Sequence, residues 1–178
     1  MRTALHWWPV VAVAGLFALG WLVGKGSTPL DDDLLAFDAP NWLLVYVKAP
    51  ALVAVLAVAV GYALWRGRWR LAVVAALCPP VAVVSAQLLK RVFGRGRDGE
   101  LAYPSGHVTA LVVVAGMVVL VAGGRLWAVV LATVAVVVGM ILVGMSFHYF
   151  TDTVGALLLG SAYVAVAARL VTGPRCVT

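Results

Sequence analysis

Long apolar stretches follow one another along this chain of 178 residues, and they limit its possible folds more than any other feature. A helix that crosses a lipid bilayer needs roughly 20 mostly apolar residues. Hydropathy and helix breakers divide the chain into six such stretches, at residues 6–23, 42–65, 71–89, 105–122, 126–147 and 153–171. Only 11% of the residues are charged, which is too few to cover a soluble domain of this length. We therefore expect an all-α fold, a single polytopic bundle of six transmembrane helices that occupies residues 1–178.

The first apolar stretch has two possible interpretations. Arg2 and the small residues at 12–14 are loosely typical of a cleaved signal peptide. The apolar run continues beyond them to Val23, so we expect an uncleaved helix. In the loop that follows, the run from Leu34 to Phe37 is a candidate for a short interfacial helix.

The charged residues predict how the bundle is oriented. Six spans put both ends of the chain on one side, together with an arginine set that consists of Arg2, Arg66, Arg68, Arg70, Arg125, Arg169 and Arg175. The seven acidic residues all fall on the other side, and they are Asp31, Asp32, Asp33, Asp38, Asp98, Glu100 and Asp152. The positive-inside rule makes the arginine side cytoplasmic. The net charge of +6 is therefore interpreted as a topology signal, and no nucleic-acid partner is expected.

The connection between the third and fourth stretches is an exception to this separation of charge. It lies on the outer side, yet it contains four cations, Lys90, Arg91, Arg95 and Arg97. Cations placed against the positive-inside rule need a compensating partner. An anion is the simple candidate, because Lys and Arg donate charge-assisted hydrogen bonds to phosphate oxygens.

Two more polar segments are expected on the same face of the membrane. The segment Pro104-Ser105-Gly106-His107 opens the fourth stretch, and the free N–H groups of a helix start favour an anion. Gly106 lets the backbone approach a ligand closely. The second segment contains His148 and Asp152, between the fifth and sixth stretches.

The two histidines of these segments are the side chains suited to proton transfer or nucleophilic attack near neutral pH. Asp152 follows His148 by four residues, so a helical turn places both on one face. A carboxylate in that position holds the imidazole and stabilises its cation. No cluster of metal-ligating side chains accompanies them, and we expect neither a metal nor a cofactor.

Each of these features also has a purely structural interpretation. A histidine at a membrane interface commonly anchors a helix, and basic loops bind lipid headgroups without chemistry. Ser105 fits a helix cap, and Asp152 fits a cap of the sixth helix. Their joint occurrence on one face favours an anion site over coincidence.

In their order along the chain, these residues resemble the motifs of the type 2 phosphatidic acid phosphatase superfamily of membrane lipid phosphatases. The first motif of that family is Lys, six residues, then Arg-Pro. Lys90 and Arg97 have this spacing, although Asp98 replaces the proline. The second motif, Pro-Ser-Gly-His, is complete at residues 104–107.

The third motif of the family is matched only in part. It reads Ser-Arg, five residues, His, three residues, Asp, and His148 and Asp152 fit its second half. Ile141 and Leu142 occupy the Ser-Arg positions, so the arginine that clamps the phosphate in the family is missing. We expect Arg95 to take over this phosphate contact, because it lies two residues from Arg97 and the glycines on either side of it let the chain bend. Loss of one transition-state donor would otherwise reduce turnover by about a hundredfold or more.

The resemblance implies a mechanism. His148 would attack phosphorus to form a phosphohistidine intermediate, Asp152 would orient it, and His107 would protonate the leaving oxygen. The residues implied to hold the phosphoryl oxygens are Lys90, Arg97, Ser105 and Gly106.

We thus expect a multi-pass lipid phosphatase of the plasma membrane, which hydrolyses a phosphate or diphosphate monoester of an isoprenoid or glycerolipid at the outer face. Its partners would be this lipid phosphate and the surrounding membrane lipids. The alternative is a catalytically weak or inactive family member that binds a lipid phosphate or acts as a partner subunit. A small transporter is less favoured, since the charged residues lie at the ends of the spans. Which lipid is bound and the oligomeric state are left open.

Overall fold

The structure, a computed structural model, describes residues 2–35 and 42–172. Its α-helices are α1 (Arg2–Val23), α2 (Pro29–Leu35), α3 (Ala49–Trp65), α4 (Trp69–Phe93), α5 (Gly106–Val121), α6 (Leu126–Gly144) and α7 (Phe150–Thr172). A 3₁₀ helix, η1 (Leu43–Val47), precedes α3. Two short strands, β1 (Gly96–Arg97) and β2 (Glu100–Leu101), form an antiparallel hairpin. Asp38 and Arg175, which the charge analysis used, lie outside the described residues.

Each expected apolar stretch contains a long helix. Helices α1, α4, α6 and α7 are long and apolar enough to cross a membrane, whereas α3 and α5 have 17 and 16 residues. The second stretch is interrupted at Lys48, where the backbone is extended at φ −76° and ψ 150°. Pro50 sits in the first turn of α3, a position where proline favours a new helix start.

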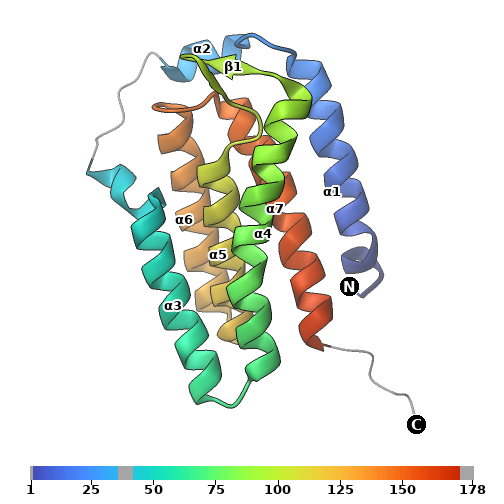
Figure 1. The fold of residues 1–178 in the computed structure, drawn as a ribbon, viewed down its shortest axis with the longest axis vertical. Helices are drawn as coiled ribbons and strands as arrows, with labels where there is room; N and C mark the ends of the chain where they lie inside the picture. Colours follow the sequence, from blue (N-terminus) through green and yellow to red (C-terminus); the bar gives the residue numbers. More distant parts are fainter. Residues whose placement is uncertain (1, 36–41, 173–178) are drawn as a thin grey trace.

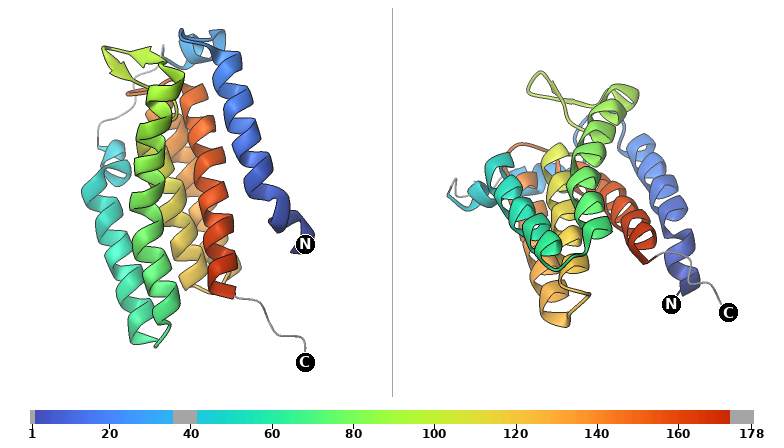
Figure 2. Two further views of the ribbon diagram at one scale, coloured as in Figure 1. Left: turned by 45° about the vertical axis from the view of Figure 1, so that its right-hand side comes forward. Right: turned by 60° about the horizontal axis from the view of Figure 1, so that its bottom comes forward.

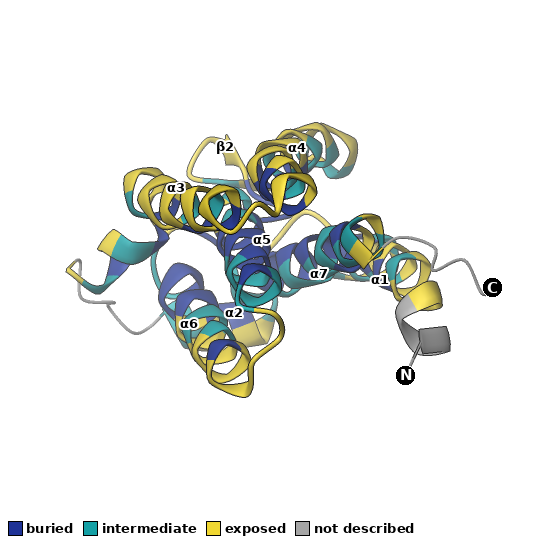
Figure 3. Cartoon of the chain, turned by 90° about the horizontal axis from the view of Figure 1, so that it is seen from below, coloured by how far each residue is buried: buried dark blue, intermediate teal, exposed yellow. Residues whose placement is uncertain are grey.

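Helix α5 lies at the centre of the bundle and packs against α3, α4, α6 and α7 (Figures 1 and 3). Its side chains are apolar around the whole helix, as expected for a helix surrounded by protein. The outer helices turn large apolar side chains away from the bundle, and Trp21, Trp65 and Leu126 are 76%, 78% and 77% exposed. An apolar surface of this extent is typical of a protein that contacts lipid.

The two ends of the bundle differ in what they carry. Helix α2 and the hairpin cover one end, together with the C-terminal end of α1, and the α3–α4 turn lies at the other (Figure 1). A short helix was expected over Leu34 to Phe37, but the observed helix, α2, begins earlier, at Pro29. Ala36 and Phe37 lie outside the described residues. The reason for the earlier start is a reciprocal cap, in which Asp31 N donates to Thr28 Oγ1 (3.3 Å) and Thr28 N donates to Asp31 Oδ2 (3.0 Å).

Tyr103 fixes the segment that leads into α5. Helix α1 lies at the edge of the bundle, beside α7 (Figure 2). The buried Tyr103 hydroxyl donates to the Leu16 carbonyl of α1 at 2.6 Å, and the ring packs edge-on against Phe93 of α4 at 4.9 Å between centroids. Gly155 of α7 faces the same ring, so Tyr103 joins three helices just ahead of the α5 start.

We expect Gly155→Ala to destabilise the fold, because its Cβ would lie 2.5 Å from Tyr103 Cε2. Overpacking of this kind typically costs about 1–3 kcal/mol. Thermal unfolding of the detergent-solubilised protein measures the loss. Gly61→Ala is the matched control, since a Cβ at Gly61 of α3 meets nothing within 4 Å. Equal unfolding midpoints for the two variants would contradict the proposed packing.

Candidate active site

The polar segments singled out in the sequence meet at the end of the bundle that carries α2 and the hairpin (Figure 1). Lys90 is in the last turn of α4, Arg97 is in β1, and His107 is in the first turn of α5. His148 lies in the connection between α6 and α7, and Asp152 lies in the first turn of α7. Five elements thus contribute one candidate residue each.

His148 is buried directly behind the end of α6. Its backbone N–H donates to the Val143 carbonyl (3.1 Å), which holds the residue against the last turn of that helix. The imidazole Nδ1 lies 3.6 Å from Asp152 Oδ2 and has no hydrogen-bond partner. This distance is slightly too long for a hydrogen bond. Catalytic hydrogen bonds are often long in a site without substrate and tighten on binding.

His107 faces His148 from the start of α5. The two imidazole centroids are 6.1 Å apart, and the Phe147 ring lies 5.5 Å from His107. The His107 side chain is exposed, whereas His148 is buried between the helix ends. One imidazole therefore has a carboxylate behind it, whereas the other is exposed.

Arg97 supplies an unsatisfied cationic group beside these histidines. Its Nη2 donates to the Ser146 carbonyl (2.9 Å), and its Nε lies 3.3 Å from Asp98 Oδ2. The guanidinium also lies over the Tyr149 ring, 5.4 Å from its centroid. Nη1 is buried and has no hydrogen-bond partner. A buried donor without a partner is costly, so this atom is suited to an incoming oxygen.

Two lysines add positive charge around His107. Lys90 and Lys48 both lie close enough for their charges to act on the His107 imidazole. Lys90 was expected here. Lys48 was not, because it was placed inside an apolar stretch, and only the break between η1 and α3 brings it to this end.

Ser105 and Gly106 have structural partners. Ser105 is the N-cap of α5, where its Oγ accepts from Val108 N at 3.5 Å, and its own N–H donates to the Asp152 carbonyl at 3.1 Å. A Cβ at Gly106 would lie 3.3 Å from Gln87 Nε2 of α4. The helix-cap interpretation of Ser105 is thus confirmed, while a contact of either residue with phosphate stays a prediction.

The expected phosphate contact of Arg95 does not agree with the geometry. Arg95 is 1% exposed, and Nη1 donates to Asp152 Oδ1 (2.8 Å) and Thr151 Oγ1 (2.7 Å). Nη2 donates to Asp31 Oδ2 (2.9 Å) and the Gly26 carbonyl (2.7 Å), and Nε donates to the same carbonyl (3.1 Å). All five N–H donors of the guanidinium are therefore occupied. Arg95 is instead a positioning residue that fixes the Asp152 carboxylate.

Position 142 supplies no donor either. Leu142 is 7% exposed and belongs to an apolar cluster with Leu44, Val108 and Val143. An arginine side chain introduced there would begin among these apolar neighbours. The phosphate contact that Leu142 lacks is therefore not replaced by Arg95.

Asp31 completes the buried network and was missed as a site residue. Its Oδ1 accepts from Thr151 N at 2.9 Å, and its Oδ2 accepts from Thr151 Oγ1 at 2.9 Å. Burial alone raises the pKa of Asp31, but hydrogen bonds from Thr151 and Thr28 outweigh it and hold the pKa below its ordinary value of 3.8. Asp31 is one of three consecutive aspartates, and nothing in the sequence distinguishes it from Asp32 and Asp33, which are exposed.

No protein-family model matches the chain, and no curated protein or solved structure is significantly similar to it.

We expect Asp31→Asn to destabilise the fold by about 1–3 kcal/mol for each buried donor left unpaired, because an amide cannot accept all the hydrogen bonds that Thr28, Arg95 and Thr151 donate to this carboxylate. Denaturant unfolding of the protein in detergent measures the loss of free energy of unfolding. Asp32→Asn is the control, because Asp32 is exposed.

The pH dependence gives this prediction a second test. The folded-state pKa of Asp31 is lowered, so its ionised form stabilises the fold fully above the ordinary value of 3.8. This stabilisation is lost as the pH falls through the lower folded-state pKa. The difference in stability between wild type and Asp31→Asn should therefore narrow only in strong acid. A difference that narrows near neutral pH would contradict the assignment.

Proposed function

We propose that this chain is a membrane lipid phosphatase, and the facing imidazoles of His107 and His148 carry the proposal. They lie 6.1 Å apart, with Asp152 behind His148 and the unpartnered Arg97 Nη1 beside them. One imidazole for attack and one for proton transfer, next to a cationic donor, is what metal-independent transfer of a phosphoryl group needs. The partial match to the motifs of the phosphatidic acid phosphatase superfamily supports the same chemistry.

In the proposed mechanism, His148 is the nucleophile. Its Nδ1 faces Asp152, so Nε2 attacks phosphorus and forms a P–N bond while the ester P–O bond breaks. Asp152 stabilises the positive charge that develops on the ring. His107 donates a proton to the leaving alkoxide. It then takes a proton from the water that attacks phosphorus, breaks the P–N bond and releases inorganic phosphate.

The phosphoryl oxygens would be held by cations rather than by a metal ion. In transit, the phosphoryl group spreads its charge over three oxygens. Arg97 Nη1 is free for one of them, and Lys90 and Lys48 bring charge close to the same space. The backbone N–H groups in the first turn of α5 are further donors.

The substrate class follows from where this site lies. A headgroup bound at the ends of apolar helices leaves its tail beside the lipid-facing surface. A phosphate or diphosphate monoester of an isoprenoid or a glycerolipid fits this arrangement.

A catalytically weak or inactive lipid-phosphate binder is the second candidate. The observation that favours it is the short supply of arginine donors, since Leu142 is apolar and Arg95 is fully occupied. Losing one transition-state donor typically reduces turnover by about a hundredfold or more.

The chemistry is tested by phosphate release from purified protein. The panel contains prenyl phosphate, prenyl diphosphate, phosphatidic acid, phosphatidylglycerophosphate and prenyl-phosphosugar. We expect His148→Ala to abolish turnover while lipid binding persists, and His107→Ala to reduce turnover by about 10²–10⁴-fold. His6→Ala changes an exposed histidine of α1 and should have no effect. Undiminished release by His148→Ala would exclude the mechanism, and no release by wild type would favour the binder.

We also propose that all six long helices cross the plasma membrane, with both ends of the chain cytoplasmic and the histidines at the outer face. Helix α5 is short, but it is surrounded by other helices and so does not have to match the bilayer thickness itself. Acidic residues are found in α2, the hairpin and α7 at one end, and Arg66, Arg68 and Arg125 lie at the other.

Cysteine labelling tests this topology. Asp98→Cys and Arg125→Cys are introduced singly after Cys78 and Cys176 are replaced by alanine. An impermeant maleimide added to intact cells should label position 98, whereas position 125 should react only after permeabilisation. Labelling of both positions from the same side would refute six spans.

A further inference from the structure

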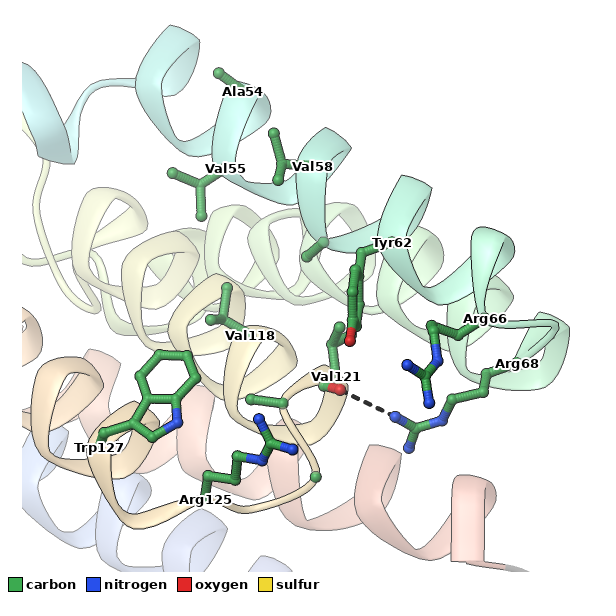
Figure 4. A pocket seen from close by; sticks show the side chains of 13 residues that line it. Ala54, Val55, Val58, Tyr62, Arg66, Arg68, Val118, Val121, Arg125 and Trp127 are labelled. Atoms are coloured by element: carbon green, nitrogen blue, oxygen red, sulfur yellow. Dashed lines mark hydrogen bonds between the residues drawn. The ribbon is translucent and has the colours of Figure 1, made fainter.

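A large groove lies at the opposite end of the bundle from the histidines. Its volume is about 940 Å³, within the range of sites that bind small molecules. Residues from α3, α5, α6 and the turns between helices line it, among them Val55, Val58, Val118, Arg66 and Arg125 (Figure 4). None of its lining residues is acidic.

The groove results from how three helices pack. Helices α3 and α6 both pack against α5, but they make very little contact with one another. Near the histidine end, η1 fills the space between them, and its Tyr46 hydroxyl donates to the Ala135 carbonyl of α6 at 3.0 Å. Beyond η1, α3 presents small side chains, among them Ala54 and Val58, and the space between α3 and α6 stays open.

Three arginines from two turns, the α3–α4 turn and the α5–α6 turn, line this groove. Figure 4 shows Arg66 and Arg68 on one side and Arg125 on the other. Arg68 Nη1 donates to the Val121 carbonyl at 2.9 Å, which holds this side chain at the groove. Within the described residues, the side chains of Arg66 and Arg125 have no hydrogen-bond or ion-pair partner. Both guanidinium groups are therefore available to an anion.

The groove is amphipathic along its length. Arg125 is the N-cap of the 19-residue helix α6, so free backbone N–H groups and the helix dipole add to the positive end. Val55, Val58 and Val118 make the other part apolar. Tyr62 lies between Val58 and Arg66, and Trp127 lies beside Val118 and Arg125 (Figure 4). Aromatic residues are common at a membrane interface.

We propose that this groove binds one anionic phospholipid from the membrane leaflet at the arginine-rich end. The phosphate lies between Arg66 and Arg125, with Arg68 beside it, and an acyl chain follows the valines of α3 and α5. A soluble anion would use the arginines but leave the apolar part empty, whereas a neutral lipid would leave the three positive charges unpaired. The site lies at the other end of the bundle from the histidines, so it is independent of the proposed phosphatase activity.

Spin-labelled lipids test this site in the full chain reconstituted into phosphatidylcholine vesicles. The measurement is the fraction of motionally restricted phosphatidylglycerol compared with that of phosphatidylcholine. We expect wild type to prefer phosphatidylglycerol, and Arg66→Ala with Arg125→Ala to lose on the order of fivefold in preference per arginine. Arg70→Ala is the control, because Arg70 lies at the same end but outside the groove, stacked on Trp69 at 5.6 Å.

Two more arms separate the possible outcomes. Val58→Trp fills the apolar part of the groove without changing its charge, and it should remove the preference for phosphatidylglycerol. This variant keeps the proposal testable if the double arginine variant does not fold. Glycerol 3-phosphate should not displace the lipid, and displacement would mean that a soluble phosphate is the ligand. The proposal is wrong if the arginine variants and Arg70→Ala behave alike, or if Val58→Trp keeps the preference.

Discussion

The buried guanidinium of Arg95 holds the histidine end of the bundle together. It lies between carboxylates from α2 and α7 and bonds the Gly26 carbonyl after α1, so one charge connects four parts of the chain. A buried charge is tolerated only when its partners are complete. One positive charge with two negative charges gives a formal total of −1, and one of the two carboxylates, that of Asp152, faces His148. Because Oδ1 of that carboxylate is held by Arg95, Oδ2 is directed at the imidazole and at Tyr149 N.

Much of this architecture could be predicted from the sequence because its signals are local. Apolar runs of sufficient length have few alternatives to helices, and each of the six expected runs contains one. His107, His148 and Asp152 were expected together because helix count and four-residue spacing bring them to one face. The break at Lys48 was missed because the apolar residues on both sides of Lys48 and Pro50 were taken as one continuous run, although the charge and the proline together mark a new helix start.

The sequence-based predictions were wrong or incomplete where a side chain bonds a residue that is distant in the sequence. Arg95 and Arg97 are two residues apart in the same loop, and both guanidinium groups lie over the Tyr149 ring. Nothing local shows that the first has all its donors occupied while the second keeps one free. The β1–β2 hairpin decides this, since it leaves Arg97 partly buried beside Tyr149 while Arg95 is enclosed. Asp31 bonds Thr151, which is 120 residues later in the sequence. Its neighbours Asp32 and Asp33 are the same residue type but are exposed, so the sequence alone does not show which aspartate is buried.

The pairing of α1 with α7 bears on how the chain assembles during synthesis. Arg95 and Asp31 both emerge well before Asp152 and Thr151, so in the nascent protein the guanidinium has only one of its two carboxylates. Until α7 packs against α1 and α5, the guanidinium therefore lacks the hydrogen bonds that Asp152 and Thr151 accept from it in the folded protein. Arrival of this late helix supplies the second carboxylate, the hydroxyl of Thr151 and the backing of His148 in one step. The geometry of the candidate site is therefore completed only by α7, and a chain shortened before this helix would lack both Asp152 and Thr151.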